Sequence, residues 1–187
     1  MSTPRTILLF MVLVVIIFSG CKKESATTLK EPMLGMEFIQ IPKGSFQMGA
    51  AKINSNSNSR QAHQVTISKD FWLGRTEVTQ NQWQQIMGSE EIHPEKPSPF
   101  RGVNPDYPVV DVSYFDVEKF LEQLNEQSNQ YRFRLPTEAE WEYACRAGTT
   151  TPFAFGLRLD DSLANYNAEV ASEYSTLGKF LEHPAPV

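Results

Sequence analysis

The chain has 187 residues, of which 41% are hydrophobic and 21% charged, so it holds enough apolar material for one globular core. This composition excludes an intrinsically disordered or collagen-like chain. The 17 lysines and arginines against 22 aspartates and glutamates give a formal charge of -5, and no stretch gathers the basic residues, which argues against nucleic acid as a partner. The two cysteines, Cys21 and Cys145, are too few for a disulfide framework.

The first 21 residues have the pattern of an export signal. Arg5 precedes an uninterrupted apolar run of 12 residues, Ile7 to Phe18. A run of this length is too short to span about 30 Å of hydrocarbon, and it is typical of the apolar centre of a signal peptide. Two small residues then precede Cys21, which resembles the lipobox of bacterial lipoproteins. We therefore predict a signal peptide over residues 1–20 and lipidation of Cys21, with a plain export signal as the alternative.

The segment that follows the leader is polar and has no sustained period. We interpret residues 21–35 as a tether that begins at the lipidated Cys21, and we expect a single domain over residues 36–187. This arrangement predicts an exported protein that is anchored to the membrane by lipid and faces the periplasm or the cell surface of a bacterium.

Short strands and one short helix are predicted for the first half of the domain. Segments 36–41 and 45–48 flank a turn with Pro42 and Gly44, which favours a β-hairpin. An alternating Asn and Ser run at 54–59 indicates a solvated loop, and two further strands are expected at 63–68 and 71–75. Thr79 and Gln82 have the spacing of a capping box, so a helix is expected from Thr79 to Gly88.

The second half of the domain is predicted to be more helical and then irregular. Residues 94–108 hold five of the 12 prolines and indicate a long loop. After a short strand, a helix should begin at Ser113 and bury one apolar stripe; after another strand, a helix should begin at Thr137 and end at Gly148. The ranges are 109–112 and 131–135 for the strands, and 113–128 for the first helix. Because strands and helices follow no βαβ rhythm and the region after Gly148 has no period, the fold class is an irregular, loop-rich α+β domain.

Four motifs in fixed order resemble the formylglycine-generating enzyme family, also called sulfatase-modifying factor. The resemblance covers the chain from about Met36 to Val187, and it implies a single loop-rich domain that is distantly similar to the C-type lectin fold. It also implies the family activity, which is copper-dependent oxidation of a sulfatase cysteine to formylglycine. The motifs are Phe38-Ile39-Gln40-Ile41-Pro42-Lys43-Gly44-Ser45-Phe46-Gln47-Met48-Gly49, Arg75-Thr76-Glu77-Val78-Thr79-Gln80, Tyr107-Pro108-Val109-Val110-Asp111-Val112-Ser113 and Tyr131-Arg132-Phe133-Arg134-Leu135-Pro136-Thr137-Glu138-Ala139-Glu140-Trp141-Glu142-Tyr143-Ala144.

The sequence departs from the family after its last matching segment. In the family, a stretch like residues 163–167 is followed by a Pro-Val pair, a Gly-Asn-Val-Trp-Glu-Trp motif and an Arg-Gly-Gly-Ser-Trp stretch that bears the paired active-site cysteines. Here the sequence ends at Pro186-Val187. We therefore expect a C-terminally incomplete domain with no catalytic residue and no cofactor of its own, copper belonging to the complete family enzyme.

The remaining thiol, Cys145, is predicted to be a buried structural cysteine. It lies four residues after Trp141, which is the spacing of a core stripe on one helix face. Its place in the last turn of the helix also disfavours a thiolate. Trp141 is therefore predicted to be a core residue, and Glu77 and Arg134, which lie in family motifs, are interpreted as structural residues that form ion pairs.

The resemblance further implies a calcium site. Asn165 matches a family ligand position, and Tyr166 would offer its backbone carbonyl. A lysine, Lys179, stands near the place where the family supplies a carboxylate, and the nearby Asp160 and Asp161 are equally consistent with a solvated loop.

Three hypotheses for the function stay open at this point. The first is an exported enzyme-family domain that lacks the chemistry in this chain. The second is a non-catalytic binding or structural surface lipoprotein that uses the same scaffold. The third is an oxidase whose C-terminal half is encoded separately or lost by a frameshift. The expected partners are the membrane, through the lipid anchor, and a protein partner or that separate half.

Overall fold

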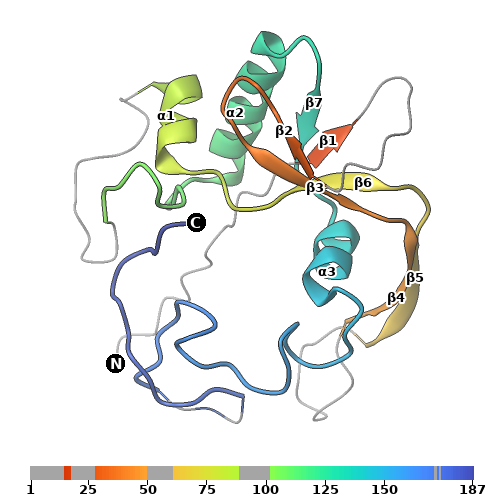
Figure 1. Ribbon diagram of the computed structural model, residues 1–187, viewed down its shortest axis with the longest axis vertical. Helices are drawn as coiled ribbons and strands as arrows, with labels where there is room; N and C mark the ends of the chain where they lie inside the picture. Colours follow the sequence, from red (N-terminus) through yellow and green to blue (C-terminus); the bar gives the residue numbers. More distant parts are fainter. Residues whose placement is uncertain (1–14, 18–27, 50–60, 89–101, 171, 173) are drawn as a thin grey trace.

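The computed structural model describes residues 15–17, 28–49, 61–88, 102–170, 172 and 174–187. Cys21, most of the predicted leader, the Asn and Ser run and most of the proline-rich loop lie outside these residues. Short strands, helices and long connections make up the described chain (Figure 1), which confirms the predicted α+β class. The strands are β1 Val15–Ile17, β2 Thr28–Lys30, β3 Glu37–Ile41, β4 Gly44–Met48, β5 His63–Ile67, β6 Phe71–Gly74 and β7 Arg132–Arg134; the helices are α1 Gln80–Met87, α2 Tyr114–Gln127 and α3 Glu138–Arg146.

Each helix begins where the sequence predicts a cap. Thr79, Ser113 and Thr137 are the N-cap residues, and each forms a full capping box with the residue three positions later. These boxes satisfy backbone N–H groups that have no partner within the helix, which fixes where each helix starts. No helix in the described part of the chain combines the length and the apolar character that crossing a bilayer requires.

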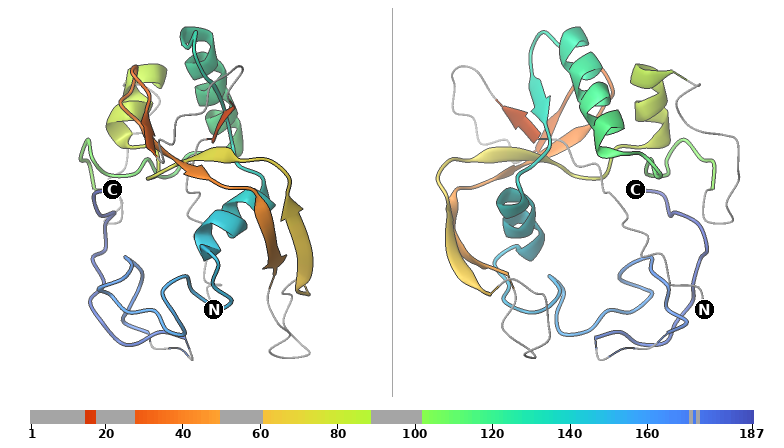
Figure 2. Two further views of the ribbon diagram at one scale, coloured as in Figure 1. Left: turned by 45° about the vertical axis from the view of Figure 1, so that its right-hand side comes forward. Right: turned by 180° about the vertical axis from the view of Figure 1, so that it is seen from behind.

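The predicted hairpin between β3 and β4 is wrong, although both strands exist. The larger sheet has the order β2-β3-β6-β1-β7, and β4 pairs with β5 in a separate two-stranded sheet. The true hairpin therefore pairs residues 37–48 with residues 63–74 as one long ribbon. Pro42 lacks an N–H and interrupts the ladder, and the Lys43 N–H donates to Asp70 Oδ1 at 2.9 Å instead. The ribbon bends sharply at this break (Figure 2).

The strand predicted at residues 109–112 is also wrong. Val109 donates its N–H to the carbonyl of Val78 at 2.9 Å, but no ladder continues from there. Asp111 has φ of 60°, in the left-handed region, which ends the extended backbone before α2.

The segment predicted as a tether belongs to the domain from Thr28 onward. Strand β2 pairs with β3, and the following Glu31 is only 1% exposed. Its carboxylate accepts the backbone N–H groups of Met33, Leu34 and Met36 at 2.7–3.0 Å. A carboxylate with such partners organises the turn that leads into β3, and Leu29, Met33 and Leu34 around it pack against the buried core.

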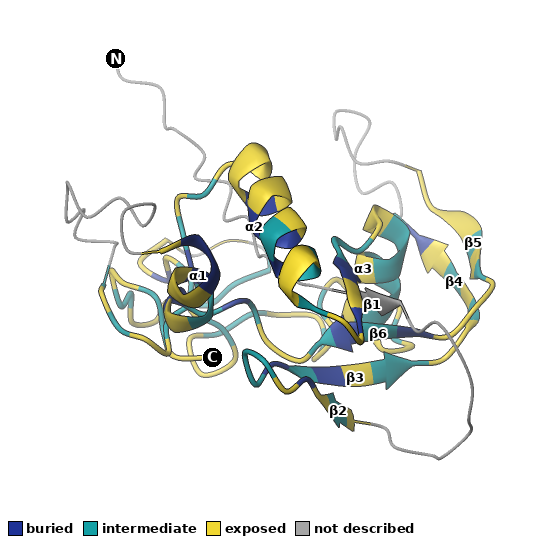
Figure 3. Ribbon diagram, turned by 90° about the horizontal axis from the view of Figure 1, so that it is seen from above, coloured by how far each residue is buried: buried dark blue, intermediate teal, exposed yellow. Residues whose placement is uncertain are grey.

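Two clusters of apolar side chains hold the elements together. The main cluster fills the space between the larger sheet and helices α1 and α2, whose buried residues are shown in dark blue in Figure 3. Trp83 of α1 stacks on Phe120 of α2 with ring centroids 4.8 Å apart. A smaller cluster is built on Phe71 and Leu73 and receives Tyr143 of α3.

The contact between α3 and β4 gives a test of the fold. A Cβ added at Gly44 would overlap the Tyr143 hydroxyl and lie 3.3 Å from its Cζ. We expect Gly44→Ala to lower the free energy of unfolding by about 1–3 kcal/mol, because the aromatic side chain must move. Tyr143→Phe removes the overlapping oxygen, so it should be close to neutral alone and should restore part of the loss in the double variant. Urea unfolding measures all three; equal losses in Gly44→Ala with and without Tyr143→Phe would contradict this packing.

Candidate functional site

The N-terminus of α3 is fixed by a two-pronged ion pair. Arg134 donates from Nη1 and Nη2 to the two carboxylate oxygens of Glu140, at 2.7 and 2.6 Å. Glu140 also accepts the N–H of Thr137 as part of the capping box. The Arg134 guanidinium is the main cause that lowers the pKa of Glu140, and the same hydrogen bonds raise the pKa of Arg134. Strand β7 and helix α3 are therefore locked at a fixed angle by one residue pair.

The middle of α3 holds the end of β4. Glu142 accepts the N–H of Gly49 at 2.8 Å, and Arg146 donates to the carbonyl of Gly49 at 2.9 Å. The two side chains also pair with each other at 2.7 Å across one helical turn. Gly49 has φ of 93°, a conformation that favours glycine. These charged residues therefore position a strand end, a role that helix spacing alone does not reveal.

The outer face of α3 corrects two predictions from the sequence. Cys145 is exposed, not buried, and Trp141 is 39% exposed, not a core residue. No residue of α3 is fully buried, and Tyr143 and Ala144, which face the smaller cluster, are half-buried. The reason is physical: the stripe has helical spacing, but no described element packs against its outer side.

Asn165 and Tyr166 lie in the irregular region after α3, where their side chains form hydrogen bonds with backbone carbonyls of the same region. Asn165 donates its amide Nδ2 to the carbonyl of His183 at 2.8 Å. The Tyr166 hydroxyl lies 2.9 Å from the carbonyl of Thr176. Asp161 accepts the N–H of Lys179 at 2.7 Å. The neighbouring Asp160 accepts the hydroxyl and N–H of Ser162, which lowers the pKa of Asp160.

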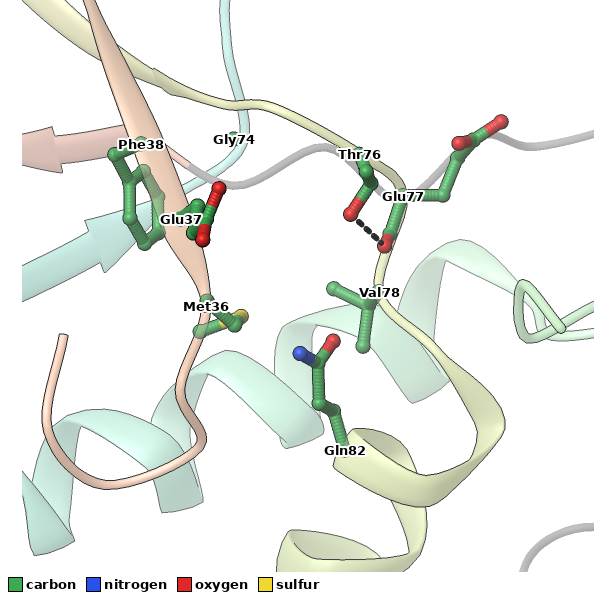
Figure 4. A pocket seen from close by; sticks show the side chains of 8 residues that line it. All are labelled: Met36, Glu37, Phe38, Gly74, Thr76, Glu77, Val78 and Gln82. Atoms are coloured by element: carbon green, nitrogen blue, oxygen red, sulfur yellow. Dashed lines mark hydrogen bonds between the residues drawn. The ribbon is translucent and has the colours of Figure 1, made fainter. Parts of the chain in front are cut away.

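Glu77 lines a small recess. The other lining residues come from the start of β3, the segment from β6 to α1, and α1 itself. The recess has a water-accessible volume of about 10 Å³, room for about one water molecule and far below the roughly 300 Å³ at which small-molecule pockets begin. Figure 4 shows the Glu77 carboxylate directed away from the other lining side chains, while its carbonyl accepts the Thr76 hydroxyl at 3.1 Å. The recess is lined by Met36, Glu37, Phe38, Gly74, Thr76, Glu77, Val78 and Gln82.

The metal-binding side chains among the described residues limit the chemistry that this part of the chain can perform. Among them, Cys145 is the single free cysteine, and no group of three or more His, Cys, Asp or Glu side chains is placed to hold a metal ion. Copper in its reduced state selects soft thiolate ligands, and one exposed thiol does not supply a pair. The residues in this part of the chain therefore do not fit a copper centre.

One structural residue of this region, Asn125, has no local sequence pattern that reveals its role. Asn125 of α2 bonds both the N–H and the carbonyl of Phe133, at 2.7 and 2.9 Å. An asparagine on the polar face of a helix is expected to be solvated. Only the arrangement of α2 against β7 shows that Asn125 binds the backbone of Phe133.

Comparisons with known proteins agree with this fold. The family model described as the sulfatase-modifying factor enzyme 1-like domain matches residues 24–187. A chaperone protein, LppX of Paenibacillus barcinonensis, is 28% identical over 164 residues, which covers 70% of this chain and 50% of that protein. The formylglycine-generating enzyme of Bos taurus is 35% identical over 85 residues, which covers 45% of this chain and 21% of that enzyme.

A solved structure, that of PvdO from Pseudomonas aeruginosa, superposes with a TM-score of 0.62 at 25% identity and covers 85% of this chain and 68% of that one. The chain spans half or less of the length of these two curated relatives.

The Arg134 and Glu140 pair predicts how stability depends on pH. A carboxyl whose pKa is lowered by folding stabilises the fold above its unfolded pKa, and this contribution is lost as the pH falls through the folded value. We expect the free energy of unfolding to fall below about pH 4.5, the reference value for Glu140. Glu140→Gln should flatten that fall and cost about 1–2 kcal/mol at pH 7. Urea unfolding from pH 3 to 7 tests this; Glu126→Gln, on the exposed face of α2, is the matched control. An unchanged pH profile in Glu140→Gln would contradict it.

Proposed function

Because the chain belongs to the family of sulfatase-modifying factor enzyme 1-like domains, we propose that it is an exported bacterial lipoprotein whose 187 residues bind a partner and do not oxidise a cysteine by themselves. The observation that carries the proposal is the state of Cys145. It is an exposed thiol on a helix face with no second thiol among the described residues.

The reaction of the complete family enzymes needs a pair of thiolates. These soft ligands hold copper and exchange with the substrate sulfur. The whole sequence contains Cys21 and Cys145. In this proposal Cys21 carries the lipid anchor, so its sulfur is not available as a ligand. Cys145 alone then leaves the chain without the chemistry.

A binding role is supported by the surface of the irregular region after α3. Leu157, Val170 and Leu177 are 68%, 68% and 69% exposed, and Phe155 and Leu163 are about half exposed. These apolar side chains are accessible for contact with another protein, which is the role that we propose for this region. The similarity to a protein named as a chaperone supports the same role.

The lipoprotein part of the proposal predicts acylation of Cys21. We expect the intact mass of protein extracted from membranes to show that residues 1–20 are absent and that lipid is attached to Cys21, because a 12-residue apolar run is suited to processing and not to spanning. Cys21→Ala should abolish both changes, and Cys145→Ala should leave them intact. A soluble form that begins at another residue would contradict the prediction.

The catalytic part of the proposal predicts that the purified chain forms no aldehyde. Incubated with a cysteine peptide from a sulfatase, copper and oxygen, it should give no formylglycine above a protein-free control by mass spectrometry. A complete formylglycine-generating enzyme in the same mixture is the positive control. Aldehyde that disappears in Cys145→Ser would show that this thiol is catalytic.

A further inference from the structure

Strand β1 occupies the centre of the larger sheet. It lies between β6 and β7 and runs antiparallel to both. Val15 is level with Leu73 and Arg134, and Ile16 is level with Trp72 and Phe133. Because β6 and β7 are each antiparallel to β1, they run in the same direction as one another, and β1 separates them in the sheet.

The same three residues lie inside the apolar run of the predicted leader. On the proposed function, from which this inference starts, processing removes residues 1–20 and β1 with them. We propose that the processed chain presents a slot between β6 and β7, and that this slot binds an apolar strand of a partner polypeptide, antiparallel to both neighbours.

Strand β7 keeps its place without β1. On its outer edge, the Asn125 amide holds the backbone of Phe133 through both of its hydrogen-bonding groups. The ring of Phe133 also lies 6.0 Å from the ring of Phe38, which reaches across from β3. The ion pair of Arg134 with Glu140 fixes the end of the strand to α3. These contacts come from α2, β3 and α3 and do not depend on the leader.

The slot cannot close by a small movement. Adjacent strands lie about 4.8 Å apart, so β6 and β7 are roughly two such spacings from each other. To pair directly, β7 would have to move by about one spacing, away from Asn125 and from Glu140. Such a movement breaks the hydrogen bonds and the ion pair just described.

The backbone of β7 faces the slot with groups that need partners. Alternate residues of a strand direct their N–H and C=O groups to opposite edges. Because Phe133 directs its groups outward to Asn125, Arg132 and Arg134 direct theirs toward the slot. Backbone groups left without partners inside a sheet are costly, so an extended segment that pairs with them gains affinity from the main chain.

The neighbours of the slot define the side chains of the guest. The middle residue of the guest would be level with Trp72 and Phe133, on the face of the sheet that packs against the main cluster, where Phe133 is 4% exposed. The residue before it would be level with Leu73, which is 8% exposed and belongs to the smaller cluster. The middle position therefore demands an apolar residue, and the residue before it, which is also level with the Glu140-paired Arg134, can be apolar beside Leu73. The occupant in the unprocessed chain, Val15-Ile16-Ile17, meets that demand. A β-branched guest is favoured, and proline or a charge at the middle position is excluded.

The test uses the processed lipoprotein, purified in detergent, with its mass measured first. Amide hydrogen exchange is then followed with and without a synthetic peptide, Lys-Thr-Val-Ile-Val-Thr-Lys. Two control peptides carry Pro or Asp in place of the central Ile. The β4 and β5 pair, which forms a separate sheet and does not pair with β1, is the internal reference.

We expect the amides of Arg132 and Arg134 to exchange at least tenfold more slowly at saturating peptide, with no change in β4 and β5 and no effect of either control peptide. The inference is overturned if these amides are already as protected as β4 and β5 without peptide, or if saturating peptide does not slow them. A mass that retains residues 1–20 overturns both the lipoprotein assignment and the open slot. An acylated mass without a peptide effect overturns the slot alone.

Discussion

The long bent ribbon of residues 37–48 and 63–74 is the element on which the rest of the domain depends. Its first part supplies β3 and β6 to the larger sheet, and its second part supplies the β4 and β5 pair. One face of the ribbon meets α1 and α2 through the main cluster, and Phe71, Leu73 and Ile67 meet α3 through the smaller one. The break at Pro42 permits the change of direction between the two parts. Both clusters thus share one backbone, and a shift in the ribbon would disturb each of them.

The helices are buried to very different degrees on this frame. Helices α1 and α2 each bury four residues, whereas α3 buries none. Helix α3 is held by polar contacts, with Arg134 at its start and Gly49 bound by Glu142 and Arg146, together with the half-buried Tyr143 and Ala144 against the smaller cluster. Because charge-assisted hydrogen bonds are directional, these ion pairs and hydrogen bonds fix the orientation of α3 although the helix buries little area. The helix can therefore keep its place while its outer face, with Trp141 and Cys145, stays open to another surface.

Local signals in the sequence predict the local structure well. The three capping boxes and the apolar stripe of α2 place the helix starts correctly, because both depend on residues within four positions of each other. Strand pairing was predicted poorly, since the partner of residues 37–48 lies beyond a long loop and the nearer hairpin looked sufficient. Cys145 was misplaced for a similar reason. A helical stripe reports which residues share a face, but it does not report whether anything covers that face.

The role of Glu31 and Asn125 shows a second limit of sequence reasoning. Both are polar residues whose partners are backbone groups: Glu31 organises a turn, and Asn125 holds the outer edge of a strand. Their partners are main-chain groups, which leave no trace in composition or period. Such residues are found only when the fold shows which backbone groups lack a ladder partner.

The apolar segment at residues 15–17 has two chemical descriptions that compete for the same residues. As part of a leader it suits the apolar centre that export machinery binds, and as β1 it completes a sheet whose other strands cannot pair directly. Valine and isoleucine satisfy both demands, because the side chains that favour hydrocarbon also favour a buried strand. On the proposed processing, removal of the leader would change the sheet as well as the location of the protein. Completion of the sheet would then be a binding event, and the same covalent cleavage would export the protein and expose the proposed binding site.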